Sequence, residues 1–205
     1  MAGDAVHRVV VATRNRGKLE EIRASLDLPG WEFVTAEELG ADPPDVVEDG
    51  CTFTDNAMLK AAAFHERFRF PALADDSGLV VDALGGEPGV HSARYSGPEA
   101  DDATNNAKLL TALEDMLEED RVARFHCTMV YIDETGMPTA AMGMCQGRIA
   151  LEPRGEGGFG YDPLFLPDET PGRTMAELDL DEKNRISHRG RALRFLQTAL
   201  LGSEW

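Results

Sequence analysis

Residues 70–81 constrain the fold of this chain more than any other stretch, because two adjacent aspartates interrupt an otherwise apolar run. An apolar approach over residues 70–73 leads into Asp75 and Asp76, and a run rich in valine follows over residues 79–81. Two neighbouring carboxylates repel each other unless a cation or a shared proton relieves the repulsion, and oxygen ligands of this kind suit Mg²⁺. Aspartate, serine and glycine are also ordinary turn formers. Taken alone, the stretch therefore favours a turn at the end of a strand over a metal site.

The length and apolar content of the chain predict a single domain over residues 1–205. The chain has 205 residues, of which 42% are hydrophobic, and this is enough to bury a substantial core. Its formal charge is −17, from 20 basic and 37 acidic residues, which disfavours binding to nucleic acid or to an anionic membrane. A small anionic substrate stays compatible with this charge, because salt screens exposed charges beyond about 8 Å and a local basic pocket can prevail.

Cysteine usage and hydropathy predict a soluble protein of the cytoplasm. Cys51, Cys127 and Cys145 are odd in number and lack metal-finger spacing, so free thiols in a reducing compartment are the simplest interpretation. Residues 1–8 lack the apolar segment of a signal peptide. No apolar run approaches the length of about 18 residues that would suggest a membrane span.

A strand, a polar loop and a helix near the N-terminus form an arrangement suited to anion binding. Val9 to Ala12 predicts a short buried strand. The loop after it comprises Thr13, Arg14, Asn15, Arg16, Gly17 and Lys18. A helix follows and ends before Pro29 and Gly30, so backbone N–H groups and the positive end of a helix are available to an anion. The loop lacks the GxxxxGK[ST] pattern of a P-loop, which disfavours a kinase or ATPase of that class.

Apolar periodicity predicts a mixed α/β arrangement for much of the remaining chain. Strands are expected at residues 31–34, 124–132 and 139–149, and helices at residues 53–68 and 102–117. A turn at residues 133–136 joins two of these strands into an antiparallel hairpin, so the sheet should be mixed. Asn56 and Lys60 lie four residues apart on the first of these helices and therefore share a face.

Two further stretches carry side chains suited to ligand binding. Residues 155–163 place four glycines around Phe159 and Tyr161. Such a loop can approach a ligand closely and offer it an aromatic face. Residues 181–189 form a basic cluster before a final helix, and in so acidic a chain this cluster suits an anion or an electron-rich partner.

Five separated stretches together resemble one family. In chain order they are ATRNRGKLEE, EDGCTFTDNAMLKA, ADDSGLVVDALGGEPGVHSARYSG, GFGYDP and EKNRISHR. They resemble the inosine/xanthosine triphosphate pyrophosphatases, the Ham1-like or RdgB-like enzymes that act on noncanonical purine nucleotides, and the resemblance spans about Val9 to Leu200. It implies an elongated mixed α/β fold with two lobes and a central active-site cleft. It also implies Mg²⁺-dependent hydrolysis of ITP, dITP and XTP to the monophosphate and pyrophosphate, and a homodimer.

The resemblance implies that lysines and carboxylates serve the phosphate end of the substrate. The whole N-terminal loop named above would contact the triphosphate, with Lys18 as its point charge, and Lys60 would add a further phosphate contact. Glu48 and Asp76 would bind magnesium, with Asp75 as a direct ligand or as a neighbour of one. Asp76 would also be the proton acceptor for hydrolysis, because a carboxylate can deprotonate or orient water while Mg²⁺ and lysines neutralise phosphate charge.

Other implied contacts belong to the base and ribose end, apart from Ser77, which would touch the substrate directly. Phe159 would stack on the purine. The full set at this end is Phe159, Gly160, Tyr161, Asp162, Lys183, His188 and Arg189. Donors such as Arg189 and the loop N–H groups match the 6-oxo group of hypoxanthine or xanthine. The 6-amino group of adenine would place donor against donor and leave buried groups unpaired.

Two alternatives stay open on the sequence. A noncatalytic nucleotide-binding or sensing module on the same scaffold would bind ITP without turnover, although the carboxylates that an enzyme needs are all present. A related pyrophosphatase for modified pyrimidine or guanine nucleotides is disfavoured by the GFGYDP and SHR stretches, by resemblance alone. Arg14, Asp55 and His91 depart from the commonest residues of the family, and the shorter side chain of Asp55 leaves it out of the metal set.

Overall fold

The computed structural model describes residues 6–26 and 28–202, so the expectation for residues 1–5 lies outside it. Its strands are β1 (His7–Val11), β2 (Trp31–Val34), β3 (Ala72–Val81), β4 (Val122–Ile132), β5 (Pro138–Ile149) and β6 (Phe165–Pro167). Its α-helices are α1 (Arg16–Ser25), α2 (Phe53–Phe68), α3 (Asp102–Ala112), α4 (Leu180–Ile186) and α5 (His188–Leu201). Short 3₁₀ helices are η1 (Asp82–Leu84), η2 (Gly89–Arg94), η3 (Glu118–Asp120) and η4 (Met175–Glu177). Among the described residues, no helix combines the length and hydropathy that crossing a bilayer requires.

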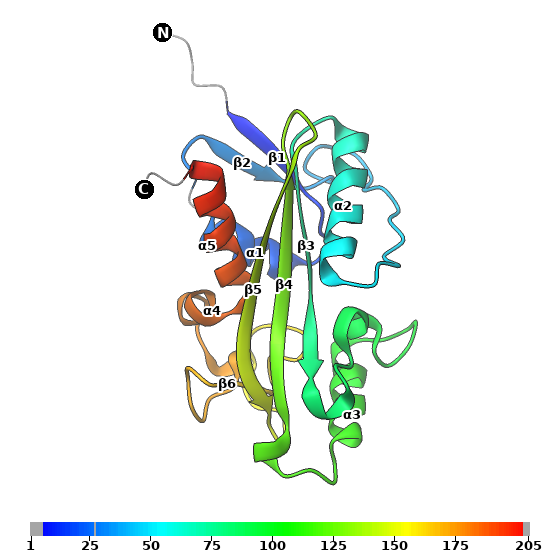
Figure 1. Cartoon of the computed structure of the whole chain (residues 1–205), viewed down its shortest axis with the longest axis vertical. Helices are drawn as coiled ribbons and strands as arrows, with labels where there is room; N and C mark the ends of the chain where they lie inside the picture. Colours follow the sequence, from blue (N-terminus) through cyan, green and yellow to red (C-terminus); the bar gives the residue numbers. More distant parts are fainter. Residues whose placement is uncertain (1–5, 27, 203–205) are drawn as a thin grey trace. The chain divides into compact units, whose positions relative to one another are not determined.

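Within the described residues the strands form one six-stranded sheet in the order β2-β1-β3-β4-β5-β6 (Figure 1). β1 runs parallel to β2 and to β3, whereas β6 is antiparallel to β5. β4 and β5 are neighbours joined by a tight turn, in which the Gly136 N–H donates to the Asp133 carbonyl at 3.0 Å. The predictions of a mixed α/β fold and of this turn are confirmed. The sequence pattern does not predict β6, because three residues are too few to show a periodicity.

The chain divides into two compact units. Unit 1 comprises Met1–Asp76, Cys127–Met142 and Ala192–Trp205, and unit 2 comprises Ser77–His126 and Gly143–Arg191. Strands β3, β4 and β5 each contribute residues to both units, and the first boundary falls inside β3 between Asp76 and Ser77. The single domain over residues 1–205 and the cleft between two lobes stay predictions.

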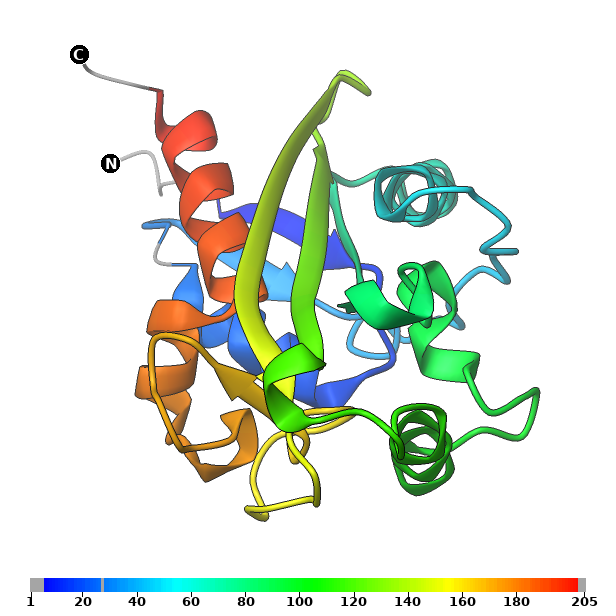
Figure 2. The ribbon, with the colours of Figure 1, turned by 60° about the horizontal axis from the view of Figure 1, so that its bottom comes forward.

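Unit 1 has a hydrophobic core on each face of its part of the sheet, because side chains alternate between faces along a strand. Val9 and Val11 of β1 pack in the core that α1 and α5 complete. Val10, between them, packs in the core that α2 completes. Figure 1 and Figure 2 both show α2 and α5 on opposite sides of β4 and β5. Unit 1 is therefore layered, with helices on both faces of the sheet.

Strand β3 corrects the expectation of a turn at the two aspartates. Asp75 and Asp76 lie inside a continuous ten-residue strand and are 2% and 7% exposed. The strand continues through them because each carboxylate has a cationic partner, Lys18 for Asp75 and Lys60 for Asp76. Since successive side chains point to opposite faces, Asp75 projects toward α1 and Asp76 toward α2. The interpretation of this stretch as a turn is wrong.

Unit 2 has a hydrophobic core to which α3, β6 and its strand segments contribute. Leu109 is completely buried there, and the rings of Phe125 and Phe165 have centroids 4.6 Å apart. Helix α3 ends at Ala112, earlier than the predicted end at residue 117. Leu117 is exposed and so does not belong to the buried stripe that suggested the longer helix.

Candidate functional site

The loop after β1 leads into α1, as the sequence predicts. Thr13 and Arg14 lie in the loop, Asn15 is the N-cap, and Arg16, Gly17 and Lys18 form the first helical turn. The Asn15 side chain accepts a hydrogen bond from the Lys18 N–H at 3.1 Å, and the Thr13 hydroxyl accepts one from the Asn15 N–H at 3.1 Å. This capping satisfies one of the open N–H groups at the start of the helix. The helix therefore begins at Arg16, inside the stretch expected to be loop.

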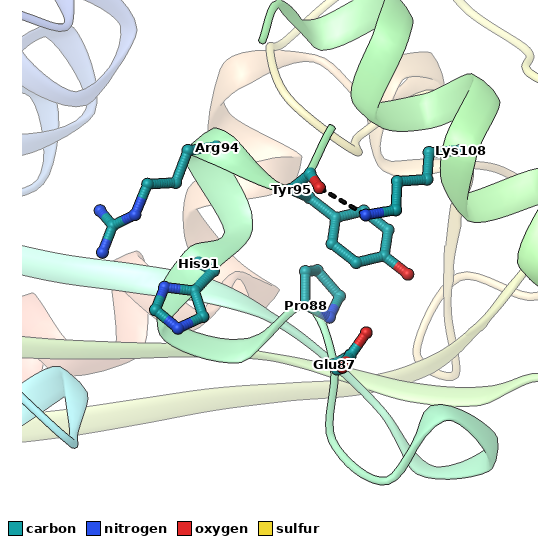
Figure 3. Close-up of a pocket in the computed structure, with 6 residues that line it drawn as sticks. All are labelled: Glu87, Pro88, His91, Arg94, Tyr95 and Lys108. Atoms are coloured by element: carbon teal, nitrogen blue, oxygen red, sulfur yellow. Dashed lines mark hydrogen bonds between the residues drawn. The ribbon is translucent and has the colours of Figure 1, made fainter. Parts of the chain in front are cut away.

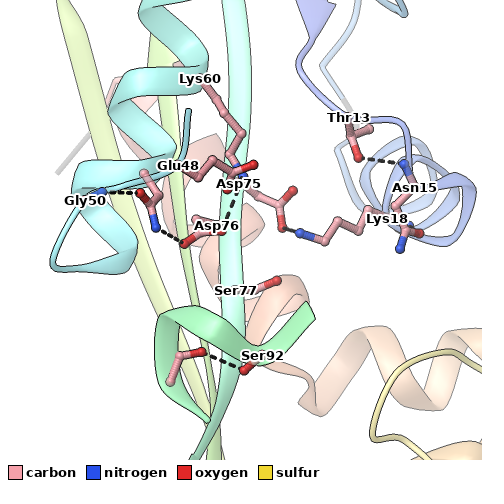
Figure 4. Close-up of polar contacts among 12 residues, drawn as sticks. Thr13, Asn15, Lys18, Glu48, Gly50, Lys60, Asp75, Asp76, Ser77 and Ser92 are labelled. Carbon is pink, nitrogen blue, oxygen red and sulfur yellow. Dashed lines mark hydrogen bonds and ion pairs between the residues drawn. The ribbon is translucent and has the colours of Figure 1, made fainter. Parts of the chain in front are cut away.

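Lys18 forms an ion pair with Asp75 on the α1 face of β3. Its Nζ lies 3.0 Å from Asp75 Oδ2, and the Asp75 side chain is almost completely buried. Figure 4 shows Asp75 reaching toward Lys18, while Asp76 points to the other side of the strand. A carboxylate taken out of water needs such a partner, because an unpaired buried charge is strongly destabilising.

Lys60 of α2 forms ion pairs with two carboxylates on the opposite face of β3 (Figure 4). Its Nζ lies 2.8 Å from Glu48 Oε2 and 3.3 Å from Asp76 Oδ1. Burial lowers the pKa of Lys60, but the negative charges of Asp75, Asp76 and Glu48 outweigh burial and raise that pKa overall. Burial also raises the pKa of Asp76, although Lys60 and Lys18 oppose the shift. A raised pKa makes the Asp76 carboxylate a stronger proton acceptor than an exposed aspartate.

Asn56 belongs to the site, although the sequence pattern only places it on one helix face with Lys60 and does not mark it as a candidate site residue. Its Nδ2 donates to Asp76 Oδ2 at 3.3 Å, and its Oδ1 accepts the Gly50 N–H at 2.8 Å. The buried Asn56 side chain thus ties the loop that carries Glu48 to the aspartate on β3. The four-residue spacing from Lys60 that the sequence shows is the signal that points to Asn56, because it places both side chains on one face of α2.

Helix α2 is held at its start by a reciprocal capping box. The Asp55 N–H donates to the Thr52 hydroxyl at 3.1 Å, and the Thr52 N–H donates to Asp55 Oδ2 at 3.0 Å. Two otherwise open donors are satisfied in this way. Asp55 therefore has a structural role at the helix start, next to the turn that presents Asn56.

The donor set on the α2 face suits a divalent cation such as magnesium. Glu48 and Asp76 approach the same ammonium group, so their oxygens converge on the place of one positive charge. Mg²⁺ prefers oxygen ligands, and one or two carboxylates beside substrate phosphates are its usual protein ligands. Asp75 lies on the other face of β3, paired with Lys18. Over residues 6–26 and 28–202, no three Asp, Glu, His or Cys side chains come together as a metal site.

In unit 2 a buried ion pair lies beside the Phe159 ring. Lys183 Nζ is 2.7 Å from Asp162 Oδ2, and the two side chains are 6% and 4% exposed. The Lys183 Nζ lies 4.7 Å from the centroid of the Phe159 ring, and the Arg189 Cζ lies 5.6 Å from it. Cations at these distances are attracted to the ring face. The glycine-rich loop, α4 and α5 thus bring one aromatic ring and two cations together.

Two N–H groups of this loop, those of Phe159 and Gly160, are already engaged. The Phe159 N–H donates to Asp162 Oδ2 at 2.9 Å, and the Gly160 N–H donates to Asp102 Oδ2 at 2.7 Å. The sequence suggests loop N–H groups, together with Arg189, as donors that match the 6-oxo group of a base. The structure instead places the two charged donors beside the Phe159 ring and directs these two N–H groups to carboxylates.

The remaining predicted residues of unit 2 differ in what they contact. Arg189 Nη2 donates to the Ser77 hydroxyl at 2.9 Å, so α5 and β3 meet at this pair. His188 is buried and stacks on Phe125, with ring centroids 4.6 Å apart and planes at 15°. Tyr161 is buried in the core, and its hydroxyl donates to a backbone carbonyl of η2 at 2.8 Å. Tyr161 and His188 therefore pack against protein groups.

A pocket of about 290 Å³ in unit 2 is separate from these clusters (Figure 3). Its lining consists of Glu87, Pro88, His91, Arg94, Tyr95 and Lys108. Lys108 Nζ donates to the Tyr95 carbonyl at 2.7 Å and lies 4.1 Å from the centroid of its ring. None of the residues expected to bind substrate or metal lines this pocket, so the candidate site is defined by the charged clusters.

The structure brings most of the predicted residues into two groups. The lysine–carboxylate cluster of unit 1 contains Lys18, Glu48, Lys60, Asp75 and Asp76. The aromatic–basic cluster of unit 2 contains Ser77, Phe159, Asp162, Lys183 and Arg189. The chain passes directly from the first cluster to the second at the Asp76–Ser77 peptide bond.

Comparison with known proteins shows the relatives of this chain. The model of the Ham1 family matches residues 9–199. A Geobacter sulfurreducens protein named dITP/XTP pyrophosphatase is 53% identical over 193 residues, which are 94% of this chain and 96% of that protein. An Escherichia coli protein of the same name is 48% identical over 198 residues, which are 95% and 98% of the two chains. The solved structure of a HAM1 protein from Coxiella burnetii has a TM-score of 0.83 and 45% identity, and the match covers 96% of this chain and 99% of that one. The chain therefore belongs to the Ham1 family.

Proposed function

We propose that this protein hydrolyses ITP, dITP and XTP to the nucleoside monophosphate and pyrophosphate, and so removes noncanonical purine nucleotides from the nucleotide pool. The observation that carries the proposal is the meeting of Glu48 and Asp76 at the Lys60 ammonium group. Attack of water on a phosphate needs a carboxylate that accepts or orients a proton and cations that offset negative charge. The names of the Geobacter and Escherichia relatives support the same substrate class.

In this mechanism the lysine–carboxylate cluster acts on the phosphate end. Asp76, whose pKa is raised by burial, takes a proton from the attacking water or orients it. The water oxygen bonds to the α-phosphorus as the bond from that phosphorus to the bridging oxygen breaks, and pyrophosphate leaves. Phosphate oxygens of the substrate compete with the carboxylates for the ammonium groups of Lys18 and Lys60, which offset the charge that develops.

We propose magnesium as the cofactor, held by Glu48 and Asp76, with Asp75 as a neighbour of these ligands, because Asp75 lies on the other face of β3 and pairs with Lys18. When bound, Mg²⁺ polarises phosphoryl oxygens and offsets their negative charge. What supports this assignment is the convergence of two carboxylates on one positive charge.

The aromatic–basic cluster would select the base. Phe159 offers a ring face on which a purine can stack. Lys183 and Arg189 lie beside that ring and carry donors, which match the 6-oxo group of hypoxanthine or xanthine. The 6-amino group of adenine would face these donors with donors of its own and leave buried groups unpaired.

We also propose that the protein works as a homodimer, as the family resemblance implies, and that it is located in the cytoplasm, as its cysteine usage suggests. The odd number of cysteines and their lack of metal-finger spacing suit a reducing compartment. A mass in solution of twice the 22.4 kDa of one chain, measured by sedimentation equilibrium, would support the dimer, and a mass of 22.4 kDa would reject it.

The other candidate, a noncatalytic binding or sensing module, would bind ITP without turnover. Such a module has no need of a carboxylate with a raised pKa beside two half-buried lysines, and that arrangement favours the enzyme. No contact among the residues that the structure describes favours a noncatalytic module over the enzyme.

Product analysis tests the proposed function. The purified protein is incubated with ITP, dITP, XTP, GTP and ATP, each with Mg²⁺ and with EDTA, and the products are separated by ion exchange. Monophosphate and pyrophosphate from ITP, dITP and XTP, formed with Mg²⁺ alone, are the expected result. Stepwise release of orthophosphate would reject the reaction, and tight binding without products would favour the sensing module. Equal turnover of all five would keep the reaction and reject the role given to the aromatic–basic cluster.

A further inference from the structure

The loop that carries Phe159 is bounded by two glycines with left-handed backbone geometry. Gly158 has φ +74° and Gly160 has φ +62°. Glycine adopts this geometry at little steric cost, but it also gives a loop many alternative conformations. On the Gly158 side the Asp162 carboxylate restricts the loop, because it accepts the Phe159 N–H at 2.9 Å. The ring keeps one position only if the Gly160 side is held as well.

Helix α3 holds Gly160 at both of its backbone groups. The Gly160 N–H donates to Asp102 Oδ2 at 2.7 Å, and Asn106 Nδ2 donates to the Gly160 carbonyl at 2.9 Å. Asp102 and Asn106 are four residues apart and so lie on one face of α3. An acceptor and a donor are thus matched to the two backbone groups of a single residue.

Helix α3 is itself well anchored within unit 2. A capping box between Asp101 and Thr104 closes its first turn. Leu109 is completely buried in the core, and Asn105 Oδ1 accepts the Ser96 N–H at 2.7 Å. A loop residue bound to this helix therefore has a fixed reference in the unit.

The backbone N–H and carbonyl of Gly160 do not need Asp102 and Asn106 merely to have hydrogen-bond partners. Asp102 is exposed, and ordered water can bond to the backbone of a surface loop nearly as well as a side chain does. What a side chain on an anchored helix adds over water is a defined position for the loop. The contacts of Asp102 and Asn106 with Gly160 are therefore suited to fixing the position of the loop that carries Phe159.

We propose that Asp102 and Asn106 are positioning residues for base recognition, which hold Gly160 and thereby hold the Phe159 ring beside Lys183 and Arg189. The inference rests on the proposed function, since that function makes a purine base the ligand of the ring. Both residues act through Gly160, so their loss weakens binding of a substrate that is read through its base. The chemical step at the lysine–carboxylate cluster does not depend on them.

Steady-state pyrophosphate release from ITP tests the inference. Asp102→Ala removes the acceptor, and Asn106→Leu removes the donor at similar volume. Loss of one positioning hydrogen bond should raise KM for ITP by roughly three- to tenfold and leave kcat within about twofold. Asp102→Asn keeps an oxygen acceptor and should restore most of the affinity. Asp115→Ala, which removes an exposed carboxylate beyond the end of α3, is the control and should change neither constant.

Inhibition by pyrophosphate separates positioning from general damage, because pyrophosphate has no base. Its inhibition constant should be the same in the variants and in the unaltered protein. A KM for ITP that stays unchanged would overturn the inference, as would an inhibition constant that rises together with KM. If the unaltered protein releases no pyrophosphate, the proposed function fails. Calorimetric binding of ITP to the same variants then decides the positioning role separately.

Discussion

Asp75 and Asp76 are neighbours in the chain, yet they have different partners. Strand alternation sends Asp75 to Lys18 of α1 and Asp76 to Lys60 of α2. Each carboxylate therefore meets its own ammonium group, and the repulsion between two adjacent charges is offset locally. The same alternation separates the roles, because Asp76 shares its face with Glu48 while Asp75 does not.

Replacing Asp76 by asparagine should abolish most of the turnover while largely sparing ITP binding. The change removes the proton acceptor and keeps the shape of the side chain, so kcat for ITP should fall by about a hundredfold or more. KM should change far less, because both lysines remain. Asp49→Asn, an exposed carboxylate next to Glu48, should keep kcat within about twofold. The test is to measure kcat for ITP in both variants. A kcat close to that of the unaltered protein in Asp76→Asn would show that Asp76 is not the proton acceptor.

Helix α2 supplies one member of the lysine–carboxylate cluster and a side chain that supports another member. It carries Lys60, and Asn56 on the same face donates to Asp76. Its start is closed by the capping box of Thr52 and Asp55. The position of these side chains therefore depends on the first turns of one helix.

Removing the N-cap of α2 should weaken the fold measurably. Thr52→Ala deletes the acceptor for the Asp55 N–H, and loss of such a cap typically costs about 1 kcal/mol. Urea unfolding followed by circular dichroism should show a lower midpoint with an unchanged slope. Thr111→Ala, at an exposed position of α3, should shift stability by about 0.5 kcal/mol or less. An unchanged midpoint for Thr52→Ala would contradict the importance of the cap.

The whole molecule combines a net charge of −17 with two lysines that are mostly buried among carboxylates. The surface charge repels itself and destabilises the compact state. Buried pairs are screened by salt much less than exposed charges. The lysines can therefore act on an anionic substrate although the surface is acidic.

Added salt should raise the thermal stability of the protein. Going from about 10 mM to about 150 mM NaCl shortens the screening length from roughly 30 Å to roughly 8 Å, which weakens the repulsion among acidic groups. Exposed ion pairs such as Arg8–Glu32 lose strength as well, but each contributes only about 0–1 kcal/mol. Calorimetry should show a Tm that rises with NaCl, and a comparison with KCl at equal ionic strength controls for specific ions. A falling Tm would mean that exposed ion pairs outweigh the net charge.

Local signals predicted several elements well. The expected helix at residues 53–68 coincides with α2, because its apolar periodicity and its start lie within the segment itself. The strand at residues 31–34 coincides with β2. The course of β3 through Asp75 and Asp76 was not predicted, since its continuation depends on lysines from two other elements.

Family membership and the residue types of the site were readable from the linear sequence, because each motif is a short run whose spacing the chain itself preserves. The contacts that those residues make with other parts of the chain could not be read from the linear sequence. Asn56 on Asp76, Lys183 on Asp162 and Asp102 on Gly160 are contacts between elements, the last over 58 residues of sequence. Such contacts arise when helices pack on a sheet and bring distant side chains within hydrogen-bonding range, and no local periodicity encodes them.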